Sequence, residues 1–447
     1  MDIKMTIDML AKRRQIRARE HWTRERLETY QARSLRQLRD YAYAHSPFYQ
    51  QFHKGLYEAP LEDLPALSKA MLMEHFDDLV TDRAIHLPDA QKFMTKQQAN
   101  ELYLGRYVVS GTSGSSGHPG VFLADRGEWL TLLAGALRAF EAAGIKFRLT
   151  HRLKLAMMTS TTAFHASTQG GASLGSWWMP VLNLAASEPV PVMVERLNAW
   201  QPEALLGYAS LLRILADEQL AGRLHIKPHS MLSSSEVLTP ETRRLVEQAW
   251  GKVLFNMYSS TECGLAAECN QHRGLHLQED LVIVEVVDQN NRPVPPGVYG
   301  DKLLLTVLFK YTQPLIRYEM SDSVRLSAER CPCGRPFRLI DAIAGRSEEE
   351  LSFAGAAGER VKIQPLVFNR IMDTLPVSGW QVVQQADDSL QLLLRGVHGE
   401  LDDEELANTV RQALAEQGAR MPAVAVKRVT SIPQSVAGKT PLIKSNR

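Results

Sequence analysis

The stretch PETRRLVEQAWGKVLFNMYSSTE, residues 240–262, indicates the fold class. Pro240 to Trp250 has the apolar spacing of an amphipathic helix, and Gly251 is the residue type that ends one. Val253 to Met257 then predicts a short buried strand, which polar side chains follow as far as Glu262. Because helices that alternate with buried strands are typical of α/β proteins, this stretch predicts an α/β fold.

The same alternation continues on both sides. Upstream, Arg152 to Met158 predicts another buried strand, and Trp129 to Ala143 predicts an amphipathic helix that Gly144 stops. Downstream, Leu281 to Val287 and Lys302 to Phe309 predict paired strands, since the residues between them are typical of turns. We therefore expect a large, multi-layer α/β region.

The pattern changes after Gly345. The sequence there predicts a helix that begins at Pro365, strands at Trp380–Gln385 and Leu390–Leu394, a helix capped by Asp402, and a strand at Ala423–Val429. That order predicts a small α+β domain. We expect an N-terminal domain of residues 1–345 and a small C-terminal domain of residues 346–447.

The N-terminal region predicts one long helix from Met9 to about Tyr43, which Ser46-Pro47 ends. Its many arginines would suit nucleic acid, but glutamates such as Glu20 lie among them. We interpret this surface as a solvated helical face.

Composition excludes several classes of protein. The 447 residues are 45% hydrophobic and 23% charged, which is ordinary for a globular protein. Lys plus Arg number 51 and Asp plus Glu 50, so the net charge of +1 predicts no nucleic-acid or anionic-membrane partner. The sequence has no run of eighteen apolar residues and its start does not resemble a secretion signal, so we expect a cytoplasmic protein.

Four cysteines are too few for a disulfide framework, but three of them are spaced like metal ligands. Cys269 and His272 form a C-x2-H pair, and Cys331 and Cys333 form a C-x-C pair. Three thiolates and one imidazole suit a structural, tetrahedral Zn²⁺ site, with His276 as the alternative to His272. Cys263 is expected to be a small core side chain.

The segment SGTSGSSGHP, residues 110–119, has three glycines and five hydroxyl side chains. Glycines let backbone amides approach an anion closely, so the segment suits a polyphosphate. It matches neither the Walker loop nor the dinucleotide-binding fingerprint. A flexible Gly/Ser linker is the alternative interpretation.

Four further motifs follow. NMYSSTE, residues 256–262, places an aromatic ring, hydroxyls and one carboxylate at a strand end, where they could stack a base, contact a phosphate and hold Mg²⁺. IRYEMSD (316–322), IAGR (343–346) and Gly438-Lys439 complete the set. Taken singly, these motifs could be a polar turn, a salt-bridged strand, a linker and a basic tail.

In this order, the five motifs resemble those of the adenylate-forming superfamily, which comprises acyl-CoA synthetases, luciferases and nonribosomal adenylation domains. SPFY near Ser46, the form IRY-x3-D, the CPCGR stretch and a short N-terminal region resemble the phenylacetate-CoA ligase branch. Two residues depart from the family pattern. His118 stands where the loop usually has Lys, and Ser259 stands where the tyrosine motif usually has Gly.

The resemblance implies an enzyme that uses ATP and Mg²⁺ to convert a carboxylic acid into acyl-AMP. The acyl group then passes to CoA after the C-terminal domain swings about the hinge at Arg346. The catalytic residues would be Lys439, Glu262 and Thr261, with Glu262 holding Mg²⁺. The nucleotide-binding residues would be Thr112, Ser113, Gly114, Ser115, Ser116, Gly117, Ser234, Ser235, Glu236, Tyr258, Ser259, Asp322 and Arg346.

The acid would lie against Phe164, His165, Gly170, Gly171 and Trp177, where this branch lines its acyl site. Aromatic and apolar walls favour an aryl acid. The segment after the hinge lacks the usual glycine-plus-polar pattern, so a carrier-protein thiol or an amine remains the alternative acceptor to CoA. A zinc-bearing interaction or nucleic-acid module is the alternative from another class, and a homodimer is also compatible with the sequence.

Overall fold

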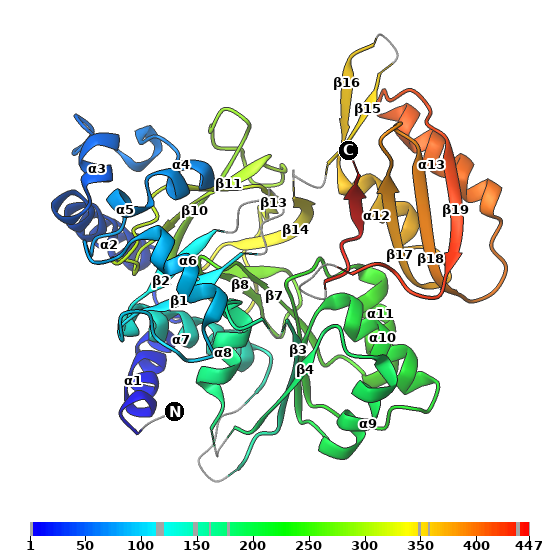
Figure 1. Cartoon of the computed structure of the whole chain (residues 1–447), viewed down its shortest axis with the longest axis horizontal. Coiled ribbons are helices and arrows are strands. Elements are labelled where there is room, and N and C mark those ends of the chain that lie inside the picture. The colour runs from blue at the N-terminus through cyan, green and yellow to red at the C-terminus, as the bar shows by residue number, and fades with distance from the viewer. Residues whose placement is uncertain are drawn as a thin grey trace.

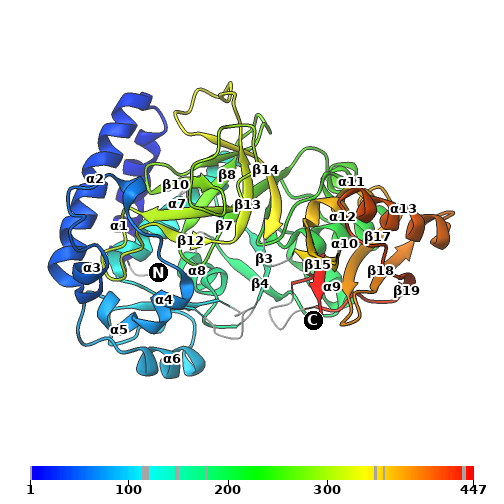
Figure 2. The same cartoon turned by 90° about the horizontal axis from the view of Figure 1, so that it is seen from above.

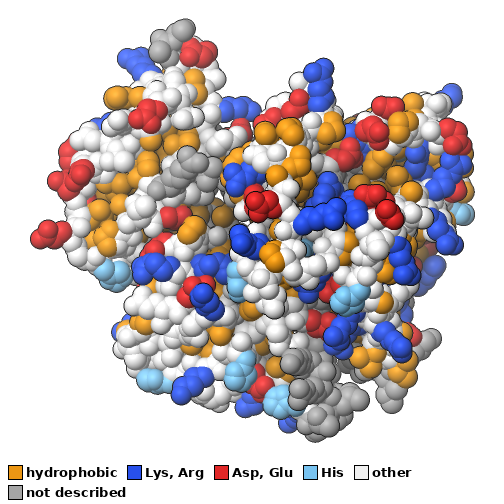
Figure 3. Space-filling model, turned by 180° about the vertical axis from the view of Figure 1, so that it is seen from behind, with side chains coloured by type: hydrophobic (Ala, Val, Ile, Leu, Met, Phe, Trp, Pro, Cys, Tyr) orange, Lys and Arg blue, Asp and Glu red, His pale blue; other side chains and the backbone are white. Residues whose placement is uncertain are grey.

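The structure is a computed structural model that describes residues 3–112, 120–145, 151–160, 162–176, 179–346, 350–355, 358–434 and 439–446. A large body and a smaller lobe, built from the C-terminal end of the chain, lie side by side (Figure 1). Within those ranges, no helix is long and apolar enough to cross a membrane. Acidic and basic side chains are interspersed on the face seen in Figure 3, which agrees with the balanced composition.

A nine-stranded sheet forms the centre of the body, in the order β13-β14-β9-β8-β7-β6-β5-β3-β4. The neighbours from β4 to β7 are parallel, and the rest are antiparallel. The strands are β3 (Leu155–Thr159), β4 (Val181–Ala185), β5 (Ala204–Gly207), β6 (Ser230–Ser234), β7 (Leu254–Ser259), β8 (Gly264–Glu268), β9 (Leu275–Leu277), β13 (Asp322–Leu326) and β14 (Leu339–Arg346).

Helices cover both faces of the parallel strands. They are α7 (Arg126–Ala142), α8 (Ala166–Leu174), α9 (Val190–Trp200), α10 (Ala209–Leu220) and α11 (Pro240–Trp250). Ala156 and Met158 of β3 face the core under α9–α11, whereas Leu155 and Met157 face the core that contains α7. This alternation follows from the two-residue repeat of a strand. The predicted α/β fold is confirmed.

The predicted helix of residues 240–250 is α11, with the same bounds, and Thr239 caps it by accepting a hydrogen bond from the Thr242 amide. The predicted helix of residues 129–143 begins earlier, at Arg126. The reason is a capping box, in which the side chains of Asp125 and Glu128 each accept a hydrogen bond from the other's backbone amide.

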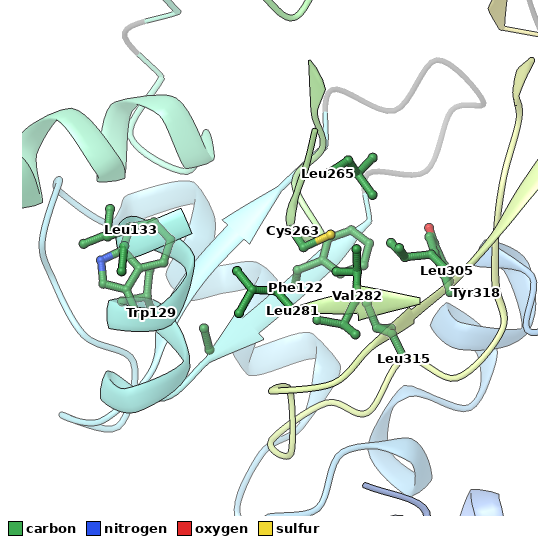
Figure 4. Packing of buried hydrophobic residues seen from close by; sticks show 14 of the residues in the cluster. Phe122, Trp129, Leu133, Cys263, Leu265, Leu281, Val282, Leu305, Leu315 and Tyr318 are labelled. Atoms are coloured by element: carbon green, nitrogen blue, oxygen red, sulfur yellow. The ribbon is translucent and has the colours of Figure 1, made fainter. Parts of the chain in front are cut away.

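Two smaller sheets pack against the main one. Strands β1 (Val108–Gly111) and β2 (Val121–Ala124) form a hairpin, and β10 (Val282–Val287), β11 (Lys302–Val307) and β12 (Tyr318–Met320) form a three-stranded sheet. The predicted pairing of β10 with β11 is confirmed. Phe122, Cys263 and Leu305 meet in the core between the sheets (Figure 4). Cys263 is fully buried there, as predicted.

The N-terminal region contains several helices, namely α1 (Ile3–Arg19), α2 (Arg24–His45), α3 (Pro47–Phe52), α4 (Lys69–Glu74), α5 (Phe76–Leu79) and α6 (Leu87–Lys96), with a 3-10 turn at Leu61–Asp63. The predicted single helix up to Tyr43 is wrong, because the chain breaks between α1 and α2. Thr23 caps α2 through its side chain, which accepts a hydrogen bond from the Arg26 amide. Ser46-Pro47 ends α2, as predicted, and it also starts α3, which was not predicted.

The small lobe has its own hydrophobic core, drawn from residues between Leu351 and Ile443. Its elements are β15 (Leu351–Ala354), β16 (Arg360–Ile363), α12 (Pro365–Met372), β17 (Val377–Gln384), β18 (Leu390–Val397), α13 (Asp403–Glu416), β19 (Val424–Val429) and β20 (Ile443–Ser445). The predicted order of helix, two strands, helix and strand is confirmed, whereas β15, β16 and β20 were not predicted. This lobe and α1–α3 lie at opposite ends of the molecule (Figure 2).

Candidate active site

The predicted functional residues gather where parallel strands of the main sheet end. The segment Ser234–Glu236 ends and follows β6, and the segment Tyr258–Glu262 ends and follows β7. Tyr208, which the sequence analysis missed, follows β5. The Oγ atoms of Ser234 and Ser259 lie 3.2 Å apart. The two motifs are therefore in contact at the edge of the sheet where α/β proteins bind ligands.

Glu236 joins three parts of the molecule. One carboxylate oxygen accepts a hydrogen bond from the Ser210 amide at the start of α10, at 2.9 Å, and the other accepts one from the Thr440 amide of the C-terminal tail, at 2.8 Å. Burial raises the pKa of Glu236, while these amides and the Lys439 ammonium oppose that rise. The resemblance implied a place at the edge of adenine, but the structure also shows Glu236 binding the tail.

Lys439 lies beside this carboxylate. Its ammonium is 5.8 Å from the centre of the Tyr208 ring, and the Tyr208 hydroxyl accepts a hydrogen bond from the Ser160 amide at 3.0 Å. Burial and the positive charge of Lys439 lower the pKa of His165 to about 4, so this imidazole is neutral at pH 7. Lys439, a residue of the C-terminal tail, thus lies among residues from the body.

Glu262 is a buried carboxylate that has no direct partner. It is only 6% exposed, and it makes no hydrogen bond or ion pair with any residue that the structure describes. Its charge acts on Lys310, which is 1% exposed and whose pKa is lowered by burial and raised by Glu128, Cys263 and Glu262. A buried carboxylate without a partner is costly, which indicates that a ligand completes this site.

Lys310 was missed by the sequence analysis, although a signal existed. It is the one charged residue in the apolar segment from Leu303 to Ile316. Its ammonium lies 5.7 Å from the centre of the Phe122 ring on β2, so it faces the strand that follows the Gly/Ser loop. A cation kept in an apolar segment needs nearby anions, and Glu128 and Glu262 supply them.

The base of the Gly/Ser loop is described at both ends. Thr112 Oγ1 accepts a hydrogen bond from the Gly120 amide at 2.9 Å, which holds the two ends together. The same hydroxyl lies 3.2 Å from the ammonium of Lys69 on α4, a residue that the sequence analysis missed. Ser113, Gly114, Ser115, Ser116 and Gly117 lie outside the described residues.

Asp322 and Arg346 are brought together by strand pairing, since they are register partners in β13 and β14. Asp322 is 7% exposed. Two motifs that are 24 residues apart in the sequence therefore meet at one end of the main sheet.

The predicted acid-binding residues cluster beside the loop base. The carbonyl of Phe164 accepts a hydrogen bond from the Gly111 amide at 2.9 Å, and His165 is the N-cap of α8. A Cβ atom at Gly171 would lie 3.0 Å from Met157 Sδ, so this glycine lets α8 approach β3 closely. Gly170 lies in the same helix, and Trp177 lies outside the described residues.

A second cluster contains thiols. Cys269, His276, Cys331 and Cys333 place their ligand atoms within 4.8 Å of one another. Cys269 Sγ lies 3.7 Å from Cys331 Sγ, and Cys333 Sγ lies 3.2 Å from His276 Nε2. Burial raises the pKa of Cys269 to about 12 and lowers that of His276 to about 4.

His272 was predicted as the fourth member of this cluster, and that prediction is wrong. Its Nδ1 instead lies 3.1 Å from a carboxylate oxygen of Glu268, and its ring packs on Phe255. His272 stands in a turn with a positive φ of 50°, whereas His276 lies on β9 and faces the thiols. The alternative, His276, fits the structure.

Comparison with known proteins supports the resemblance. No family model matches the chain. It is 25% identical over 386 residues to a phenylacetate-coenzyme A ligase from Thermus thermophilus, which covers 82% of this chain and 80% of the relative. The structure resembles 2-hydroxyisobutyryl-CoA ligase with its acyl-AMP in the postadenylation state, with a TM-score of 0.75 at 20% identity over 96% of this chain and 91% of that one.

The same ligase in its thioesterification state gives a TM-score of 0.62, over 96% of this chain and 92% of that one. These comparisons show that the chain has the fold of the adenylate-forming superfamily, as the five motifs predicted. By sequence, the chain is similar to phenylacetate-CoA ligases.

Proposed function

We propose that the protein is an AMP-forming acid–CoA ligase, which converts a carboxylic acid into acyl-AMP with ATP and then transfers the acyl group to CoA. One observation carries the proposal most directly: Lys439 lies beside Tyr208, Glu236 and His165 at the carboxyl edge of the parallel strands. Both the T. thermophilus relative and the structural neighbour are named as acid–CoA ligases.

In the first step, the acid carboxylate attacks the α-phosphorus of ATP, and pyrophosphate leaves. Negative charge converges there, so catalysis depends on cations and donors rather than on proton transfer. The Lys439 ammonium neutralises charge between the acid and the α-phosphate. Tyr258 stacks adenine, Asp322 binds the ribose hydroxyls, and Arg346 contacts the nucleotide near the hinge. Ser234, Ser235 and Ser259 lie along the edge of the adenine ring.

Glu262 would hold Mg²⁺, which neutralises phosphate oxygens when it is bound, and Thr261 would contact phosphate oxygens. The fit rests on Glu262, a buried carboxylate with no direct partner among the residues that the structure describes. Its oxygens are hard ligands of the kind that Mg²⁺ prefers.

Lys69 supplies a cation at the phosphate loop, where His118 has replaced the usual loop lysine. Its ammonium lies 3.2 Å from the hydroxyl of Thr112, which is the last described residue before the centre of the loop. A lysine ammonium is a compact charge that suits phosphate oxygens. We infer that α4 provides the charge that the loop itself lacks.

In the second step, a thiol displaces AMP. We propose that residues 346–447 rotate relative to residues 1–345 and thereby withdraw Lys439 and open the acyl-AMP to CoA. The acid itself lies near Phe164 and His165, whose neutral rings favour an aryl acid.

The test is a screen for pyrophosphate release over aryl, alkyl and amino acids, followed by AMP release with and without CoA. We expect pyrophosphate release with aryl acids and AMP release that depends on CoA. AMP release that instead needs an amine or a carrier-protein thiol would identify the alternative acceptor. Failure of every acid to release pyrophosphate would refute the proposed activity.

We further propose that Cys269, His276, Cys331 and Cys333 bind a structural Zn²⁺. Tetrahedral zinc with Zn–S bonds of about 2.3 Å separates its sulfurs by about 3.8 Å, and Cys269 and Cys331 are 3.7 Å apart. The ion would join the end of β8 to the loop between β13 and β14. Four protein ligands leave no open position, so the site would be structural.

Cys331→Ser is expected to remove zinc and lower the melting temperature together, because folding and metal binding are linked. Metal content is measured by elemental analysis and stability by calorimetry. Cys263→Ser is the matched control, since Cys263 is buried in the main core outside the cluster and should keep its zinc. Equal zinc content in the wild type and Cys331→Ser would refute the site.

A further inference from the structure

The small lobe contacts the body at two places: α12 lies against β14, and β17 lies beside α10 (Figure 1). Arg213 of α10 is 7% exposed, and its guanidinium donates a hydrogen bond to the backbone carbonyl of Val377. Val377 is the first residue of β17. A cation of the body is thus buried against the backbone of the lobe.

The strand that Arg213 contacts also holds the tail that contains Lys439. β17 pairs in parallel with β20, with Val382 opposite Ile443. The side-chain amide of Gln381 on β17 donates a hydrogen bond to the Pro441 carbonyl at 2.7 Å. Anchoring β17 therefore fixes the position of Lys439, two residues before Pro441.

Charges of both signs from the two parts surround this contact. Arg213 interacts with Asp217 and Glu241 from the body and with Asp373 from the lobe, whereas the positive charge of Arg395 on the lobe opposes it. Arg395 in turn interacts with Asp217. Buried charges of both signs across an interface set its register and give little net adhesion, because each must lose water on docking.

The contact is incompletely satisfied among the residues that the structure describes. Arg213 Nε and Asp217 Oδ2 are buried, yet neither has a hydrogen-bond partner there. Separation of the lobe would return both groups to water, which offsets part of the cost of breaking the Val377 contact. An interface of this kind suits repeated docking and release.

We propose that Arg213 is a positioning residue, a latch that holds the small lobe in the arrangement that forms acyl-AMP and that releases it for the transfer to CoA. The proposal rests on the proposed function. Arg213 acts on the reaction through β17 and Lys439 rather than by touching the reacting atoms.

The two half-reactions separate a latch from a general structural role. Arg213→Met should slow acyl-AMP formation, measured by ATP–pyrophosphate exchange, about tenfold, since it removes a hydrogen bond to a charged group. Thioester formation from supplied acyl-AMP and CoA should be unchanged or faster. Arg213→Lys keeps the charge without the planar fork and should give an intermediate loss.

Arg196→Met is the matched control. Arg196 pairs with Glu188 and donates to the backbone carbonyl of Asn183, but all three lie within the body. It should leave the ratio of the two half-reactions unchanged.

Hydrogen exchange provides a readout that does not depend on activity. Amides of β17 and of the tail around Lys439 should exchange faster in Arg213→Met than in Arg196→Met. Equal losses in both half-reactions, or hydrogen exchange that is unchanged in Arg213→Met, would overturn the proposal that Arg213 is a latch. A wild type that releases no pyrophosphate with any acid would instead refute the proposed function. The hydrogen-exchange measurement does not test that function, so the two failures can be told apart.

Discussion

Two groups of elements cover opposite ends of the body, and they are attached in different ways (Figure 2). At the N-terminal end, both carboxylate oxygens of Asp280 accept hydrogen bonds from Arg138 at 2.8 Å, and Arg138 also donates to the Ile16 carbonyl of α1 at 3.0 Å. At the other end, Arg213 makes one hydrogen bond to the lobe and no ion pair with a described residue, whereas Arg138 is also 3.2 Å from Glu20.

The same difference extends to the neighbouring charges. Glu279 has a fully buried side chain and pairs with Arg24 of α2 and with Arg338, each at 2.7 Å. Around Arg213, the nearby carboxylates are too far away to form a direct ion pair with it, among the residues that the structure describes. The comparison indicates that well-paired buried charges make a permanent attachment, whereas partly paired ones suit a reversible contact.

The largest expected effect comes from breaking the permanent attachment. Asp280→Asn removes the charge that faces Arg138 and keeps the shape of the side chain. It removes the closest counter-ion of a buried cation and leaves only Glu20, 3.2 Å from Arg138 Nε, as an ion-pair partner among the described residues. The free energy of unfolding should therefore fall by about 3 kcal/mol. Denaturant titration followed by circular dichroism measures the change.

Asp403→Asn is the control, because Asp403 forms an exposed ion pair with Arg428 on the lobe at 3.0 Å. Its effect should stay below about 1 kcal/mol. Equal losses in the two variants would mean that burial of the N-terminal pair does not distinguish it from a surface pair.

The next effect is on catalysis rather than on stability. Lys439→Ala removes the group that the reversible contact delivers to the active site. Acyl-AMP formation should fall on the order of a hundredfold or more, while thioester formation from supplied acyl-AMP should be spared. Pyrophosphate exchange and a thioester assay measure the two steps separately.

Lys444→Ala provides the matched control, since Lys444 is an exposed lysine of β20 in the same tail. It should change neither half-reaction. A parallel loss of both half-reactions in Lys439→Ala would contradict the assignment of this lysine to the first step alone.

The sequence predicted the alternating elements of the body and most of the lobe, because local hydrophobic periodicity and caps determine them. It did not predict the break between α1 and α2. There the cap of Thr23 interrupts a pattern that lacks both Gly and Pro. Strand β20 was also missed, since it pairs with β17, which is distant in sequence.

The candidate site shows the same limit. The motifs located Glu262, Asp322 and Lys439, because each has a recognisable local sequence. Lys69 and His276 depend on tertiary contacts, with Thr112 and with three cysteines respectively. The C-x2-H spacing favoured His272 over His276, whereas the position of His276 on β9 brings its imidazole to the thiols.

The smallest effect concerns Asp373 at the lobe side of the reversible contact. Burial raises the pKa of Asp373 from 3.8 to about 6, although Trp380 and Arg213 favour the charged form. Because the folded-state pKa exceeds the usual one, the contribution of Asp373 to stability is fully present below about pH 4. It is lost as pH rises through about 6.

Asp373→Asn should remove this pH dependence, since the amide cannot titrate and its oxygen can still accept the Trp380 hydrogen bond. The melting temperature of the variant minus that of the wild type should rise by ~2 °C between pH 4 and pH 7 and stay constant above. The effect is small because the carboxyl is partly exposed to water. Calorimetry at several pH values measures this difference. A difference that is constant across the range would show that the carboxyl is not desolvated, and the contact at Arg213 would then be more open to water than its burial indicates.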